Sequence, residues 1–207
     1  MKIWLRLIYQ TVINHYINIH DTSDQTLSAP LLNIINDLRD HFKQQLNQPF
    51  IIIVANEQLL LLIDNNKIIQ RSIISTAKAG LGNHKNSYQT PLGVHEISHC
   101  IGDNVELGTI FKGRVNTHKC AKILTQPQQC SNEDNITTRI LWLSGLEESV
   151  NLGGEVDTHK RFIYIHGTDE EGQLGKPVSH GCIRMANHDI IKLFSKVGVG
   201  TLVNIIR

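Results

Sequence analysis

Three short apolar runs between residues 50 and 76 place the tightest constraint on the fold. They read Phe50-Ile-Ile-Ile-Val-Ala, Gln58-Leu-Leu-Leu-Leu-Ile-Asp and Lys67-Ile-Ile-Gln-Arg-Ser-Ile-Ile-Ser-Thr. Short runs rich in aliphatic and β-branched residues and bounded by turn residues are typical of buried β-strands. Asp64-Asn65-Asn66 separates the last two runs and favours a hairpin turn. We therefore expect a mostly antiparallel sheet to begin at Phe50.

Further strand signals recur later in the chain, over residues 94–98, 139–143, 161–166 and 200–206. Between them, residues 112–138 are polar, contain Pro127 and follow neither the strand period nor the helix period. We interpret this segment as a long surface loop. Long loops in compact domains often serve as lids or binding walls.

Apolar residues spaced three and four apart predict an amphipathic helix from Ala29-Pro30 to about Gln45, followed by the breaker Pro49. The residues on its apolar face are Leu31, Ile34, Ile35, Leu38, Phe42 and Leu46. A second helix is expected from Asn187 to Val197, with Asn187 as a possible cap. Residues 1 to about 20 fit either a strand or a short amphipathic helix, and the pattern does not choose between them.

The charge balance gives no support for binding to nucleic acid or to an anionic membrane. Lys and Arg total 20 against 19 Asp and Glu, so a net charge of +1 provides no overall field for nucleic acid or an anionic membrane. No segment approaches the roughly 20 apolar residues of a spanning helix, so no transmembrane segment is expected. The N-terminal residues lack the pattern of a signal peptide. We therefore expect a cytoplasmic protein, with the periplasm as the alternative.

Two short motifs carry the chemistry. His166-Gly-Thr ends a predicted strand, and Ser179-His-Gly-Cys-Ile-Arg follows a loop of Asp, Glu, Gly and Pro residues. A thiol at the end of a glycine turn and just ahead of a helix is expected to have a lowered pKa, because backbone amides and the helix N-terminus favour the thiolate. A nearby imidazole can accept the thiol proton and later deliver it to a leaving amine. We therefore predict Cys182 as the nucleophile and His166 as its base.

These motifs resemble those of the L,D-transpeptidase catalytic domain, also called the YkuD family. Weaker support comes from Thr90-Pro-Leu-Gly and the terminal Gly200-Thr, and the resemblance covers residues 50 to 207. It implies a mainly β (α+β) fold, a sandwich with a few helices. We therefore divide the chain into an N-terminal helical extension, residues 1–48, and a catalytic domain, residues 49–207.

The resemblance also implies catalytic roles. Cys182 and His166 would be nucleophile and base, with the Gly167 carbonyl holding the imidazole in one tautomer. His180 would line the site and help to place the substrate or stabilise the transition state. Backbone amides around Gly181 and Cys182 would form the oxyanion hole.

Other residues of the motifs would support the turn or contact the substrate. Ser179 is expected to stabilise the turn through its hydroxyl. Arg184 would offer a forked cation to a substrate carboxylate. Thr168 and Tyr88 are the remaining substrate-binding candidates, although packing in the core or a turn is the simpler interpretation of Tyr88.

Members of this family attack the amide between the L-centre of a diamino acid, typically meso-diaminopimelate, and the following D-alanine of a peptidoglycan stem peptide. The thioester on the cysteine then passes to an amine, which gives a cross-link, or to water, which gives L,D-carboxypeptidation. No cofactor or metal is implied. Because no export signal is evident, we expect a carboxypeptidase of peptidoglycan recycling, with the transpeptidase as the alternative.

Each residue also has a purely structural interpretation. Cys182 could be a small buried hydrophobe, His166 a satisfied strand-end histidine and His180 a turn-shaping residue. Arg184 could cap loop carbonyls or pair with Asp189. If these interpretations hold together, the chain would be a catalytically inactive protein that binds wall peptides.

A second group of residues has metal-ligand chemistry, namely His99, Cys100, His118, Cys120 and Cys130. Their spacing lacks the paired Cys-x-x-Cys hooks of common zinc modules. We interpret them as ordinary unpaired residues. A zinc site and a Cys120–Cys130 disulfide are the alternatives.

Overall fold

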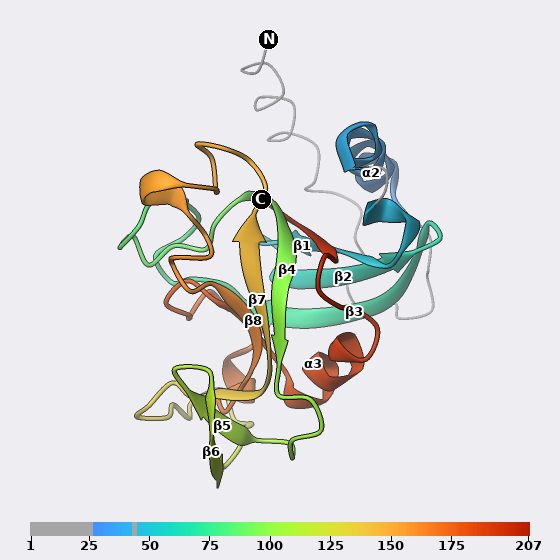
Figure 1. Cartoon of the computed structure of the whole chain (residues 1–207). Coiled ribbons are helices and arrows are strands. Elements are labelled where there is room, and N and C mark those ends of the chain that lie inside the picture. The colour runs from blue at the N-terminus through green and yellow to red at the C-terminus, as the bar shows by residue number, and fades with distance from the viewer. Residues whose placement is uncertain (1–26, 43–44) are drawn as a thin grey trace.

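The computed structural model describes residues 27–42 and 45–207, and this part of the chain forms a ten-stranded mixed sheet with two α-helices (Figure 1). The prediction of a mainly β fold with few helices is confirmed. The strand or helix considered for residues 1–20 lies outside the described residues. The division of the chain at residue 48 stays a prediction.

The first three strands follow the predicted apolar runs. β1 (Phe50–Val54) pairs antiparallel with β2 (Leu59–Asp64), and β2 pairs antiparallel with β3 (Lys67–Ser75). Asn65 and Asn66 connect β2 to β3 with left-handed φ angles of 47° and 60°. A two-residue hairpin turn requires such angles, and asparagine adopts them more easily than most residues. The predicted hairpin is therefore confirmed.

The remaining strands complete a sheet that curls back on itself. The strand order is β4-β10-β1-β2-β3-β9-β8-β7-β5-β6, and β4 also pairs with β7, which joins the two ends of the larger part of the sheet. The pairs β1–β10 and β8–β9 are parallel, whereas the other pairings are antiparallel. The bounds are β4 (Gly93–Ile101), β5 (Thr109–Lys112), β6 (Val115–Cys120), β7 (Ile136–Gly145), β8 (Tyr164–Thr168), β9 (Ile183–Met185) and β10 (Leu202–Ile206).

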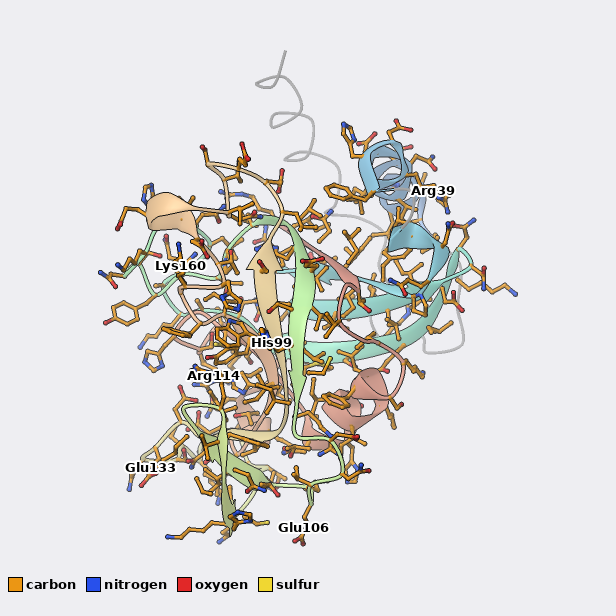
Figure 2. The ribbon with its side chains drawn as sticks, viewed as in Figure 1. Arg39, His99, Glu106, Arg114, Glu133 and Lys160 are labelled. Carbon is orange, nitrogen blue, oxygen red and sulfur yellow. The ribbon has the colours of Figure 1, made fainter. Side chains whose placement is uncertain are left out.

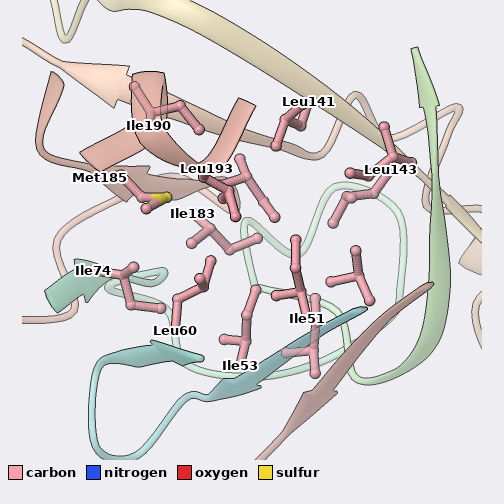
Figure 3. Close-up of a cluster of buried hydrophobic side chains, with 14 of the residues drawn as sticks. Ile51, Ile53, Leu60, Ile74, Leu141, Leu143, Ile183, Met185, Ile190 and Leu193 are labelled. Atoms are coloured by element: carbon pink, nitrogen blue, oxygen red, sulfur yellow. The ribbon is translucent and has the colours of Figure 1, made fainter. Parts of the chain in front are cut away.

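Alternate residues of the first strand enter different cores. Ile51 and Ile53 lie inside the curled sheet, where they meet apolar residues of β7, β8, β9 and the helix α3 (Asn187–Phe194) (Figure 3). Ile52 and Val54 lie on the opposite face, in a second core with β2 and the helix α2 (Ala29–Phe42). Because both faces of β1 are covered, its sequence is continuously apolar instead of alternating.

The helix α2 (Ala29–Phe42) covers the outer face of this part of the sheet, as Figure 1 shows. Leu31, Ile34, Ile35 and Leu38 are buried in the second core, so the predicted amphipathic face is confirmed. A short 3-10 turn, η1 (Gln45–Asn47), follows before β1. The described part of the N-terminal extension therefore packs on the sheet.

The interpretation of residues 112–138 as one long loop is wrong in part. β6 forms a hairpin with β5, and β7 begins as early as Ile136. Gly113 and Arg114 form the hairpin turn with φ angles of 55° and 69°. Most side chains of β6 are exposed, so the strand has no buried face to produce an alternating pattern. Residues 121–135 do form a loop.

The second predicted helix is present but shorter than expected. α3 spans Asn187–Phe194, and its cap residue is Ala186, without a side-chain cap. Asn187 is instead buried as the first residue of the helix. Two 3-10 turns, η2 (Gly154–Val156) and η3 (Glu171–Gln173), complete the elements. No helix within residues 27–42 and 45–207 is long and apolar enough to cross a bilayer.

Candidate active site

The parallel pair β8–β9 brings the two motifs together. His166 of β8 is the register partner of Arg184 of β9, so their side chains share one face of the sheet. Cys182 lies two residues before Arg184, and its side chain packs against the cluster that contains Tyr164, two residues before His166. The intervening Ile165 points to the opposite face, into the main core. The thiol, one residue before β9, and the imidazole on β8 therefore lie on the same side of the sheet.

The imidazole of His166 is buried and held in one tautomer. Its Nδ1 lies 2.7 Å from the carbonyl oxygen of Gly167. A carbonyl can only accept, so Nδ1 carries the proton and Nε2 is left with a free lone pair. Burial lowers the pKa of His166 to about 4, although the Gly167 carbonyl and the charge of Asp134 oppose this effect. The expected hydrogen bond to Gly167 is present, and the resting imidazole is neutral.

The environment of Cys182 differs from the one the sequence suggested. Its Sγ donates to the main-chain carbonyl of Phe162, 3.5 Å away. Burial raises the pKa of the thiol to about 11, while the Tyr164 backbone amide and the charge of Arg161 act in the opposite direction. The predicted lowering by a helix N-terminus is wrong, because Cys182 precedes the strand β9 and α3 begins only at Asn187.

The turn before the thiol is built from Ser179 and Gly181. The Ser179 hydroxyl accepts from the Gly181 amide at 3.2 Å and donates to the Cys182 carbonyl at 2.6 Å. Gly181 has a φ of +131°, and an added Cβ would lie 3.2 Å from Ile163 Cδ1. Thr90 Oγ1 donates to the Gly181 carbonyl at 3.0 Å. The Gly181 amide donates to Ser179, and the expected oxyanion hole at Gly181 and Cys182 stays a prediction.

Arg184 does not present a free guanidinium to substrate. It is only 3% exposed, and its two terminal nitrogens lie 2.6 Å from Asp134 Oδ1 and 2.8 Å from Glu170 Oε2. The expected role in binding a substrate carboxylate is therefore not supported by its position. Asp189 is not its partner either, because that carboxylate lies near Lys192.

Asp134, in the loop before β7, links several site residues and was not identified from the sequence. Its second oxygen pairs with Nδ1 of the exposed His180 at 3.0 Å. Burial raises the pKa of Asp134, but the charge of Arg184 and the hydrogen bond from His180 outweigh it, and the net shift is downward. Asp134 also acts electrostatically on His166. His180 thus lies at the rim of the site.

The other two substrate-binding candidates occupy different positions. Thr168 is buried; its hydroxyl accepts from the Glu170 amide and its carbonyl accepts from Asn187 Nδ2. It therefore stabilises the end of β8 and does not face an open surface. Tyr88 is 65% exposed, with a left-handed φ of 56°, and its backbone lies close to Gly181. Its ring is accessible to a substrate, and the expected contact stays a prediction.

Two further arginines lie near the site, Arg161 beside the thiol and Arg114 beside the residues that surround it. Arg161 donates to the carbonyl oxygens of Gly82 and Gln89, which ties the loop beside the thiol in place. Arg114, labelled in Figure 2, lies over the rings of Trp142 and Phe162. Arg161 is the first residue of a predicted strand, and Arg114 lies in the predicted loop. No sequence pattern therefore identified either arginine as a site residue.

The histidines and cysteines considered as metal ligands do not form a metal-binding cluster. The four cysteines are free thiols, and no cluster of three or more His, Cys, Asp or Glu side chains suited to a metal occurs in the described part of the chain. His99 instead contacts Trp142 and His159 through its ring.

Comparison with known proteins shows similarity to L,D-transpeptidases. The YkuD family, described as the L,D-transpeptidase catalytic domain, matches residues 48–205. A 46-residue segment is 50% identical to Bacillus subtilis YqjB, named as a candidate L,D-transpeptidase, and covers 22% of this chain and 26% of that protein. A segment of the same length is 52% identical to probable L,D-transpeptidase YbiS of Escherichia coli, with 22% and 15% covered. The matched segments thus span about a quarter or less of these relatives.

Among solved structures, L,D-transpeptidase 3 from Mycobacterium tuberculosis aligns with a TM-score of 0.47 and 13% identity. The alignment covers 77% of this chain and 61% of that one.

Proposed function

The chain belongs to the YkuD family of L,D-transpeptidase catalytic domains, and from that premise we propose that it is a cysteine acyltransferase that acts on peptidoglycan stem peptides. The bond cleaved would be the amide between the L-centre of meso-diaminopimelate and the terminal D-alanine. The observation that carries this proposal is the placement of Cys182, just before β9, on the same side of the sheet as His166 of β8, with Nδ1 of His166 bound to the Gly167 carbonyl.

The two side chains are suited to a reaction that starts from a neutral pair. The raised pKa of Cys182 and the lowered pKa of His166 keep the proton on sulfur at rest. As the sulfur attacks the amide carbon, Nε2 of His166 takes the thiol proton, and the imidazolium then donates it to the leaving nitrogen of D-alanine. A thioester on Cys182 and free D-alanine result.

The thioester is then attacked by an acceptor. We propose that this acceptor is the amine of a second stem peptide or of a free D-amino acid, with His166 removing the amine proton and returning it to the sulfur. The related proteins are named as L,D-transpeptidases and none of them as a carboxypeptidase. The sequence-based preference for water as acceptor depended on the lack of an export signal, whereas these names favour the transpeptidase alternative.

Mass spectrometry of the products tests both parts of the proposal. The protein is incubated with a disaccharide tetrapeptide, with and without a D-amino acid as acceptor. We expect D-alanine release together with a cross-linked dimer or an exchanged product. Cys182→Ala should lose all of these activities, whereas Cys120→Ala, which removes an exposed thiol on β6, should retain them.

Each other outcome has a distinct meaning. Products that lack D-alanine but include neither dimer nor exchange would identify a carboxypeptidase and overturn the assignment of the acceptor. D-alanine release by Cys182→Ala would show that Cys182 is not the nucleophile. If the unmodified protein binds the tetrapeptide and releases no D-alanine, it is a binding protein and the proposed function is wrong.

A further inference from the structure

We propose that Arg114 anchors a carboxylate of the substrate, at a subsite beside Cys182; this inference rests on the proposed function. Arg114 occupies the second position of the tight turn between β5 and β6, so the hairpin determines where its side chain lies. The turn lies in a segment that the sequence showed only as polar, and no motif includes it.

The guanidinium of Arg114 is held by three contacts. Its Nη1 donates to the hydroxyl of Tyr164 at 2.9 Å. Its Cζ lies 4.6 Å from the centroid of the Trp142 ring and 5.1 Å from that of Phe162. Stacking on aromatic faces fixes the plane of a guanidinium while leaving its edge available for hydrogen bonds. The side chain is therefore pre-organised to present its remaining donors.

These contacts place Arg114 at the wall of the catalytic site. Phe162, beneath the guanidinium, is the residue whose carbonyl accepts from the Cys182 thiol. The ring of Tyr164 belongs to the small cluster against which Cys182 packs. Phe162 is also 51% exposed, so this side of the site is open to solvent. A ligand bound at the thiol would meet the edge of Arg114.

Comparison of the three arginines around the thiol favours Arg114 for this role. Arg184 is buried between the carboxylates of Asp134 and Glu170. Arg161 directs its donors at main-chain carbonyls and a serine hydroxyl. Arg114 donates to one hydroxyl, and no carboxylate within residues 27–42 and 45–207 forms an ion pair with it. A guanidinium has five N–H donors, so most of the Arg114 fork is left for a ligand.

A planar fork is complementary to a carboxylate, which it binds through two parallel hydrogen bonds. The proposed stem peptide carries such groups near the scissile amide, namely the C-terminal carboxylate of D-alanine and the side-chain carboxylate of diaminopimelate. Both sources share the chemistry that Arg114 would recognise. The experiment must therefore distinguish them.

The test measures binding in protein that cannot turn over substrate. Dissociation constants are determined by calorimetry for Cys182→Ala and for Cys182→Ala with Arg114→Met. Three tetrapeptides are compared: the free acid, the D-alanine amide and the diaminopimelate amide. We expect Arg114→Met to weaken binding of the free acid about 10- to 100-fold, the usual effect of losing a charged hydrogen bond. One of the two amides should show no further loss, and that amide identifies the carboxylate.

Two control variants separate recognition from a change in the hairpin. Lys112→Met removes another cation of the same hairpin, one that pairs with the exposed Glu133, and should leave all three dissociation constants unchanged. Arg114→Lys keeps a charge without the fork and should bind the free acid with intermediate affinity. The proposal is overturned if Arg114→Met leaves free-acid binding intact, or if it weakens all three peptides equally. The proposed function is judged separately, by D-alanine release from the unmodified protein.

Discussion

The guanidinium of Arg184 donates to the carboxylate of Asp134 across 2.6 Å, which ties the strand after Cys182 to the loop before β7. Through its other oxygen the same carboxylate holds His180. The second partner of Arg184 is Glu170, which is 7% exposed and also accepts from the Ser131 amide. This network therefore connects the loop, the end of β8 and the cysteine motif.

Replacing Arg184 by Met should destabilise the fold strongly. The change leaves Glu170 buried without its cation, and breaking a buried ion pair in this way typically costs about 3–5 kcal/mol. Urea unfolding monitored by circular dichroism measures the free energy of unfolding. The double variant Glu170→Gln with Arg184→Met removes both charges and should recover part of the loss. A single variant as stable as the original protein would contradict this role.

Asp134→Asn should shift the ionisation of the proposed catalytic pair, Cys182 and His166. The Asp134 charge raises the pKa of both His166 and Cys182, so its removal should lower both. We expect the pH profile of thiol alkylation and the acid limb of kcat/KM to move to lower pH. Glu133→Gln is the matched control, because that neighbouring carboxylate is exposed and pairs with Lys112. An equal shift in both variants would mean that overall charge, and not Asp134, is responsible.

The sequence predicted those parts of the site that depend on local pattern. The apolar runs indicated β1 to β3, the asparagine pair indicated their hairpin, and the two motifs indicated Cys182 and His166. Asp134 could not be found in this way, because it meets His180 across 46 positions of sequence, from a polar segment without periodicity. The predicted lowering of the Cys182 pKa is also wrong, because burial by strands distant in sequence raises this pKa more than the local turn lowers it.

Acid should destabilise the protein through buried histidines. His95 is fully buried between the Gly93 carbonyl and Thr158 Oγ1, and burial lowers its pKa to about 4, as it does for His166. Above pH 6.5 these groups are neutral in both states. As the pH falls from 6.5 to about 4, the unfolded chain gains protons that the folded chain does not. Each group therefore removes up to about 3 kcal/mol of stability.

Urea unfolding at several pH values between 7 and 4 measures this effect for His95. His95→Gln should be less stable at pH 7 but should lose less stability on acidification than the original protein. His84→Gln, at an exposed position, should leave the slope unchanged. The explanation fails if the slope is the same in all three proteins.

Arg161→Met should make the thiol of Cys182 less reactive. The Arg161 charge lowers the pKa of Cys182 against the effect of burial, so its removal should move the alkylation profile to higher pH. A shift of half to one pH unit corresponds to about 3- to 10-fold slower labelling at a fixed pH below the pKa. Iodoacetamide labelling followed by peptide mass spectrometry gives the rate at Cys182, and the exposed Cys130 in the same sample provides the internal reference.

Arg161→Lys separates the loss of charge from displacement of the loop, because it keeps the charge but lacks the fork that binds the Gln89 carbonyl. If both variants slow labelling equally, displacement of the loop and not the lost charge explains the effect.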